Sequence, residues 1–127
     1  MALVALVAML AVAEYLFFTV QVGRARVRTG VTAPAVTGAD EFERYFRVQQ
    51  NTVEQLVIFL PSLVVSGMFL SDVFAAVVGV AFVIGRAVYY AGYTQDPESR
   101  GIGMIISFVA NAALLLGGLV GAVLALV

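Results

Sequence analysis

Polar side chains share one face of a hydrophobic segment that begins near residue 41. In an α-helix, residues four and seven positions apart lie on the same side, so Arg47, Asn51 and Glu54 form a continuous polar stripe. The rest of the segment has the composition of a membrane-spanning helix. Ionisable groups are costly in hydrocarbon, so this stripe must face the inside of a helix bundle or a ligand. The stripe is therefore the first candidate for a functional site.

A second polar group surrounds the loop after the third hydrophobic segment. Tyr89 and Tyr93 fall on one face near the end of that segment, where tyrosines are also typical of an aromatic belt at the membrane interface. Asp96 as N-cap and Pro97 at the first helical position predict a helix start just before Arg100. A cation in the first turn of a helix opposes the helix dipole. Arg100 is therefore better explained by a negatively charged partner than by helix stability.

The amino-acid composition excludes several kinds of chemistry. The sequence has no Cys and no His, which excludes disulfides, thiol nucleophiles, imidazole acid–base catalysis and the usual zinc or haem ligands. We therefore expect no metal. The seven basic residues are all arginine, which favours specific pairing with a carboxylate or phosphate.

The elements that carry these residues are expected to be membrane helices. The chain has 127 residues, of which 62% are hydrophobic and 12% are charged, whereas soluble proteins have roughly half and a quarter. At about 20 residues per crossing, four spans fit at most. Asp40 and Glu43 predict a capping box at the start of the second helix. We predict an all-α membrane protein, a four-transmembrane-helix up-down bundle forming a single domain over residues 1–127, with helices at about 2–29, 41–70, 73–94 and 97–126.

The arginines predict the orientation of this bundle. Most of them lie in or beside the loop between the first two spans, or near the loop between the last two. The positive-inside rule then places both loops in the cytosol and both termini outside. The polar groups would meet at the cytosolic ends of the helices. Glu14, near the middle of the first span, is expected to be a buried carboxylate bonded to a neighbouring helix rather than a catalytic group.

These side chains suit a small, polar ligand with several negative charges. Arginines can clamp carboxylates through two hydrogen bonds, Glu54 can accept from an amine, and Asn51 can pair with an amide. Arg100 at a helix start would stabilise a thiolate by its own charge and by the helix dipole. Glutathione has this inventory, but the residues by themselves point only to an anionic ligand. A purely structural network of buried ion pairs is the alternative interpretation of the stripe.

Three segments resemble the MAPEG family, the membrane-associated proteins of eicosanoid and glutathione metabolism. They are Phe42-Glu-Arg-Tyr-Phe-Arg-Val-Gln-Gln-Asn-Thr-Val-Glu54, Gly85-Arg-Ala-Val-Tyr-Tyr-Ala-Gly-Tyr93 and Pro97-Glu-Ser-Arg100. The resemblance extends over nearly the whole chain and is closest to the bacterial branch similar to microsomal glutathione transferases. It implies a homotrimer of four-helix protomers in the bacterial inner membrane, with glutathione bound between neighbouring protomers near the cytosolic side.

The resemblance also implies roles for individual residues. Arg100 matches the arginine that stabilises the thiolate in glutathione-using members. Glutathione would be bound by residues from two subunits, with Arg26 and Gln49 contributed by the adjacent one and the others being Arg47, Asn51, Glu54, Tyr89 and Tyr93. The implied reaction is the conjugation of glutathione, as co-substrate, to a lipophilic electrophile from the bilayer, a detoxification reaction, or the reduction of a lipid hydroperoxide.

Two positions depart from the leukotriene-forming members of the family. Arg26 is followed by Val27 rather than by a second arginine, and Gln55 stands where those members have a tyrosine. These departures argue against the leukotriene-forming reaction. Because the family also includes a lipid-binding accessory protein, a non-catalytic relative that binds a lipid or a partner protein is a second interpretation. A channel or transporter is disfavoured because only Glu14 and Asn111 could line a path through the other half of the membrane.

Overall fold

The computed structural model describes all residues, 1–127, and consists of helices without strands. Four of the helices are long and apolar enough to cross a membrane. A short 3-10 helix, η1, precedes the last of them. The bounds are α1 (Ala2–Thr29), α2 (Asp40–Phe69), α3 (Asp72–Gln95), η1 (Pro97–Arg100) and α4 (Gly101–Leu124). The predicted fold class, an all-α protein with four membrane-spanning helices, is confirmed.

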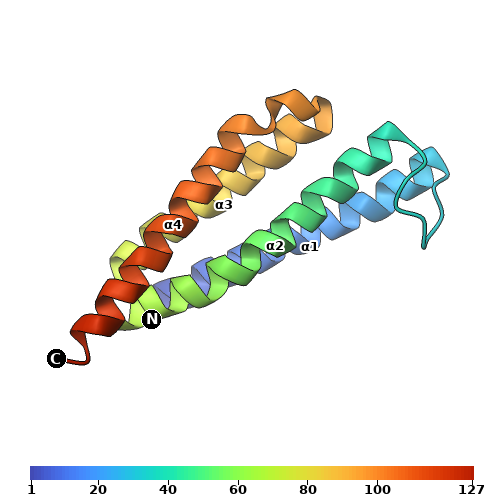
Figure 1. Cartoon of the computed structure of the whole chain (residues 1–127). Coiled ribbons are helices and arrows are strands. Elements are labelled where there is room, and N and C mark those ends of the chain that lie inside the picture. The colour runs from blue at the N-terminus through green and yellow to red at the C-terminus, as the bar shows by residue number, and fades with distance from the viewer.

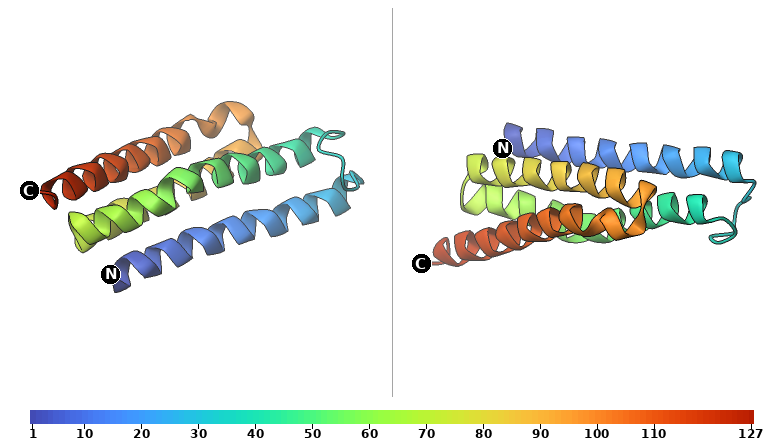
Figure 2. Two further views of the ribbon diagram at one scale, coloured as in Figure 1. Left: turned by 60° about the horizontal axis from the view of Figure 1, so that its bottom comes forward. Right: turned by 90° about the horizontal axis from the view of Figure 1, so that it is seen from above.

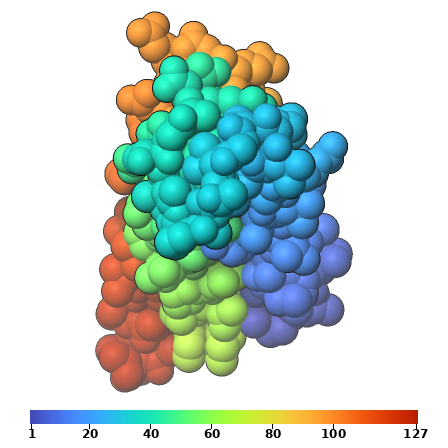
Figure 3. Space-filling model, turned by 90° about the vertical axis from the view of Figure 1, so that its right-hand side faces the viewer, coloured from blue at the N-terminus to red at the C-terminus, as the bar shows by residue number.

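The four long helices run up and down, so both chain termini lie at the same end of the bundle (Figures 1 and 2). The opposite end carries the loop of residues 30–39 together with η1, and both are seen end-on in Figure 3. The pair α1–α2 and the pair α3–α4 lie close together near the termini and diverge toward that opposite end (Figure 1). The polar residues of interest lie in this diverging half.

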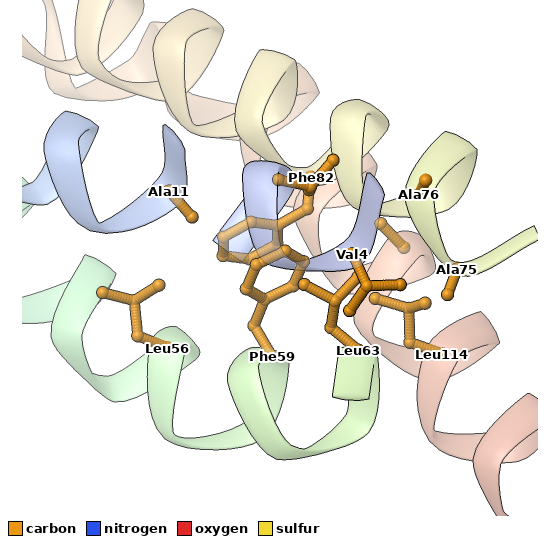
Figure 4. Close-up of a cluster of buried hydrophobic side chains, with 11 residues drawn as sticks. Val4, Ala11, Leu56, Phe59, Leu63, Ala75, Ala76, Phe82 and Leu114 are labelled. Atoms are coloured by element: carbon orange, nitrogen blue, oxygen red, sulfur yellow. The ribbon is translucent and has the colours of Figure 1, made fainter. Parts of the chain in front are cut away.

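A compact apolar cluster holds the two pairs together in the other half. The rings of Phe59 on α2 and Phe82 on α3 stack with centroids 3.9 Å apart and planes 12° apart, and both side chains are fully buried (Figure 4). Val4 and Leu114 bring α1 and α4 to the same cluster. Because lipid tails are as apolar as these side chains, tight packing rather than exclusion from water stabilises this contact.

Two helix starts lie within one residue of their predicted positions but differ from the prediction in local geometry. Asp40 is already the first residue of α2, and its N-cap is Ala39, which has no side chain to accept a hydrogen bond. The expected capping box does not form there. Asp96 does cap the next element, because its Oδ1 accepts from the backbone N–H of Glu98 at 3.1 Å. That element is the 3-10 helix η1 rather than an α-helix, so α4 begins at Gly101.

Gly103 sets the distance between α3 and α4 at the diverging end. A β-carbon at this position would overlap the backbone nitrogen and α-carbon of Tyr89. Backbone atoms cannot rotate aside as a side chain can, so only glycine permits this approach. Arg100 is placed beside Tyr89 by the same contact, because it precedes Gly103 by less than one turn.

Gly103→Ala should therefore push α4 away from α3. We expect it to lower the free energy of unfolding by about 1–3 kcal/mol, the usual range for overpacking. Gly101→Ala is the matched control, because nothing lies within 4 Å of a β-carbon there and alanine favours a helix over glycine. Thermal unfolding in detergent, followed by circular dichroism, measures both. Equal melting temperatures for the two variants would contradict the assigned contact.

Candidate functional site

Two polar cavities lie at the diverging end of the bundle. We call the deeper one the inner cavity; it has a volume of about 310 Å³, and its lining residues are Asn51, Glu54, Gln55, Arg86, Tyr89, Arg100, Met104 and Phe108. The second, the outer cavity, has a volume of about 250 Å³ and is lined by Asp40, Glu43, Arg44, Arg47, Tyr93 and Pro97. The rings of Tyr89 and Tyr93, 5.5 Å apart, join the walls of the two cavities.

The structure brings some of the predicted site residues together and separates others. Four of them line the inner cavity: Asn51, Glu54, Tyr89 and Arg100. Arg47 and Tyr93 line the outer one. The helical periodicity of α2 accounts for this division, because Arg47 lies one turn closer to the helix start than Asn51.

Arg26 and Gln49 line neither cavity. Arg26 donates to the backbone carbonyl of Ala35 at 2.7 Å, and its guanidinium lies 4.5 Å from the ring centroid of Phe42. Gln49 donates to the hydroxyl of Thr19 at 3.0 Å. Both side chains lie on the α1 side of α2 and fasten α1 and the following loop to it. Within one protomer they cannot contact a ligand in the inner cavity.

Asn51 and Tyr89 form the shortest polar contact of the inner cavity. The Asn51 amide Nδ2 donates to the Tyr89 hydroxyl at 2.6 Å. Tyr89 is only 3% exposed, packed between Phe18 and Val48. Its hydroxyl proton stays available for an acceptor in the cavity, since the oxygen can accept and donate at once.

Arg86 also lines the inner cavity, although no motif in the sequence assigned it a role. It is 2% exposed, and its Nε and Nη2 both donate to the hydroxyl of Thr52, at 3.3 and 3.1 Å. Its guanidinium carbon lies 4.0 Å from the ring centroid of Tyr89, a favourable cation–π geometry. The signal in the sequence was an arginine three residues before Tyr89 in an otherwise apolar span.

Arg100 stands at the N-terminus of α4 and closes one side of the inner cavity. Its Nη1 donates to the backbone carbonyl of Pro97 at 2.7 Å, and its guanidinium carbon is 5.9 Å from the ring centroid of Tyr93. Neither of the two ion pairs in the structure involves Arg100 or Arg86. A guanidinium has five N–H donors, so Arg100 has donors left for an anion, and the N-terminus of α4 adds its partial positive charge.

The inner cavity also has an apolar side. Met104 and Phe108 line it, are exposed, and follow Arg100 by one and two turns on the same side of α4. In a membrane these side chains meet lipid. A polar anion held by Arg100 would thus lie next to a wall that an apolar molecule can reach from the bilayer.

Comparison with known proteins identifies close relatives. The model of the MAPEG family matches residues 4–120. The chain is 41% identical to human microsomal glutathione S-transferase 2 over 119 residues, covering 94% of this chain and 81% of that protein. It is 41% identical over 115 residues to the uncharacterized protein sll1147 of Synechocystis, covering 91% and 84% of the two chains. Leukotriene C4 synthase of Cavia porcellus is 37% identical over 99 residues, covering 78% and 66%.

The contact between Arg86 and Thr52 gives a prediction about stability. Thr52→Val keeps the shape of the side chain but removes the acceptor of a buried cation. We expect a loss of about 1–3 kcal/mol, the cost of leaving a buried donor unsatisfied. Thr52→Ser keeps the hydroxyl and should retain most of the stability. Thermal unfolding followed by circular dichroism measures the stability of both variants. If Thr52→Val were as stable as Thr52→Ser, the hydrogen bond from Arg86 to this hydroxyl would not contribute to stability.

Proposed function

Because this chain belongs to the MAPEG family, we propose that it is a membrane-bound glutathione transferase that can also reduce lipid hydroperoxides. Family membership, the similarity to microsomal glutathione S-transferases and four helices long enough to cross a membrane indicate a multi-pass membrane protein with a glutathione-related function. The position of Arg100 supports the transferase activity most directly. It lies at the N-terminus of α4, in one cavity with a carboxylate, an amide and a tyrosine hydroxyl.

Glutathione would lie across the two cavities. Arg47, in the outer cavity, offers a guanidinium to one of its carboxylates, and Glu54, in the inner cavity, accepts from its amino group. The Asn51 amide and the hydroxyls of Tyr89 and Tyr93 would form hydrogen bonds with the peptide groups. The thiol would then approach Arg100, whose charge and helix terminus favour the thiolate.

The thiolate would react with an electrophile that enters past Met104 and Phe108. In conjugation, a bond forms between sulfur and carbon while the leaving group departs with its electron pair. With a hydroperoxide, the thiolate sulfur bonds to the terminal oxygen, the O–O bond breaks, and the alkoxide takes a proton to become an alcohol. A second glutathione then reduces the sulfenic acid, releasing water and the disulfide.

The remaining predicted residues require a neighbouring subunit in this proposal. Arg26 and Gln49 line neither cavity of their own protomer. In the proposed homotrimer they would contribute to the site of the neighbouring subunit, as the family resemblance implies. The site would lie on the cytosolic side of the inner membrane with both termini outside, as the arginine distribution predicts.

A second candidate function is binding of a lipid without chemistry. A groove of about 440 Å³ between α2 and α4 supports it, because six of its nine lining residues are hydrophobic. The hydrophobic ones include Ile58, Val65 and Leu115, in the half of the bundle distant from Arg100. Bound lipid with no affinity for glutathione would favour this function.

Arg100→Ala tests the proposed transferase. Titration of the detergent-purified protein with glutathione should give a saturable thiolate absorbance at about 240 nm. The variant should lose this band and most of its turnover while remaining folded. Arg24→Ala is the matched control, since Arg24 is an exposed arginine of α1 that lines neither cavity.

Retention of the band in Arg100→Ala would remove Arg100 from the thiolate site. Absence of the band in the wild type, with no glutathione binding by calorimetry, would overturn the transferase proposal and leave lipid binding.

Mixing two variants tests the shared site. Arg26→Ala and Arg100→Ala homotrimers should each be impaired, because every site lacks one arginine. In trimers that form at random from equal amounts of both chains, on the order of a quarter of the sites combine an intact Arg26 with an intact Arg100 from the neighbour. We therefore expect activity to recover on co-expression. No recovery, with mixed oligomers verified by two affinity tags, would contradict a site shared between subunits.

A further inference from the structure

Gln55 lines the inner cavity, and its side-chain amide accepts a hydrogen bond from a buried asparagine. Asn111 of α4 donates from Nδ2 to the Gln55 side-chain oxygen Oε1 at 2.9 Å and to the Gln55 backbone carbonyl at 3.4 Å. Asn111 is only 4% exposed. No hydrogen bond involves the other end of the Gln55 amide, its Nε2.

The hydrogen bonds determine which way the Gln55 amide points. A backbone carbonyl can only accept, so Asn111 must present its NH2 group to Gln55. That same NH2 group then requires the oxygen of the Gln55 amide rather than its nitrogen. The Gln55 NH2 group is consequently directed away from Asn111, and it remains free to donate to a ligand in the cavity that Gln55 lines.

This donor differs in charge from the arginines that line the same cavity. Gln55 follows Glu54 on α2, and the cavity that it lines also has the guanidinium of Arg100 and the apolar side chains of Met104 and Phe108. Gln55 thus offers a neutral N–H donor in a cavity that has both charged and apolar lining residues. An apolar molecule with one oxygen at its reacting end would meet this group.

We propose that Gln55 is a specificity-determining residue that donates a hydrogen bond to an oxygen on the reacting group of the second substrate. This inference rests on the proposed transferase function. With an α,β-unsaturated ketone, the thiolate sulfur bonds to the β-carbon, the π electrons move onto the carbonyl oxygen, and the α-carbon then takes a proton from water. The Gln55 N–H group stabilises the negative charge that develops on that oxygen.

Asn111 is the positioning residue for Gln55. Its own Oδ1 is buried and has no hydrogen-bond partner, which is unfavourable for stability. An amide that served only to join α2 and α4 would be better replaced by an apolar side chain. The hydrogen bonds from Asn111 to Gln55 explain why an amide stands here, because they fix the direction of the Gln55 side chain.

The test compares two lipophilic electrophiles, both assayed with glutathione. Benzylideneacetone carries a carbonyl oxygen on its reacting group, and benzyl chloride has no oxygen. Gln55→Met removes the donor at nearly constant volume, and Asn111→Leu removes the group that orients it. Gln50→Met is the matched control, because Gln50 lies on α2 and lines neither cavity.

We expect Gln55→Met to lower kcat/KM for benzylideneacetone on the order of tenfold, as for a lost hydrogen bond to a developing charge. The value for benzyl chloride and the glutathione thiolate band should not change. Asn111→Leu should lose part of the same selectivity while its melting temperature is equal or higher. In the Gln55→Met background, Asn111→Leu should have no further effect on selectivity, because the residues act through one another.

Unchanged selectivity in both variants, with the thiolate band intact, would overturn the role of Gln55 and leave the transferase proposal standing. Absence of the band in the wild type would overturn the transferase proposal and, with it, this inference.

Discussion

A guanidinium buried inside a membrane bundle cannot stay there without partners, and Arg86 is the group on which the polar interior depends. Its N–H groups bond to Thr52 on α2, and its charge lies over the ring of Tyr89 on α3. Tyr89 is thereby fixed, and its hydroxyl meets Asn51. One buried cation thus connects the polar stripe of α2 with the tyrosines of α3.

The small residues of α4 complete this arrangement from the other side. Gly103 lets α4 approach the backbone of Tyr89, and the turn before it brings Arg100 to the same cavity. Because Met104 follows directly on the helix, the charged and apolar walls come from one short stretch of sequence. Such a cavity can hold an anion at one side and receive an apolar molecule at the other, which is the requirement for a reaction between glutathione and a compound dissolved in the membrane.

Patterns within one helix could be predicted from the sequence, whereas contacts between helices could not. Hydrophobic length indicated the four spans, and helical spacing placed Asn51 and Glu54 on the face that lines one cavity. The 3-10 geometry of η1 could not be predicted, because Asp96 as N-cap and Pro97 as first residue suit a 3-10 helix as well as an α-helix. The orientation of the Gln55 amide depends on Asn111, which is 56 residues away in the sequence. No local pattern carries that information.

The most direct test of the central claim, that Arg100 and the start of α4 bind glutathione as a thiolate, is the number of protons released on binding. Calorimetry near neutral pH, in buffers of different ionisation enthalpy, measures this number. A free thiol has a pKa of about 8.5, so binding as thiolate should release close to one proton per glutathione, whereas S-methylglutathione should release none. Saturable binding with the same proton count for both ligands would contradict thiolate formation at this site.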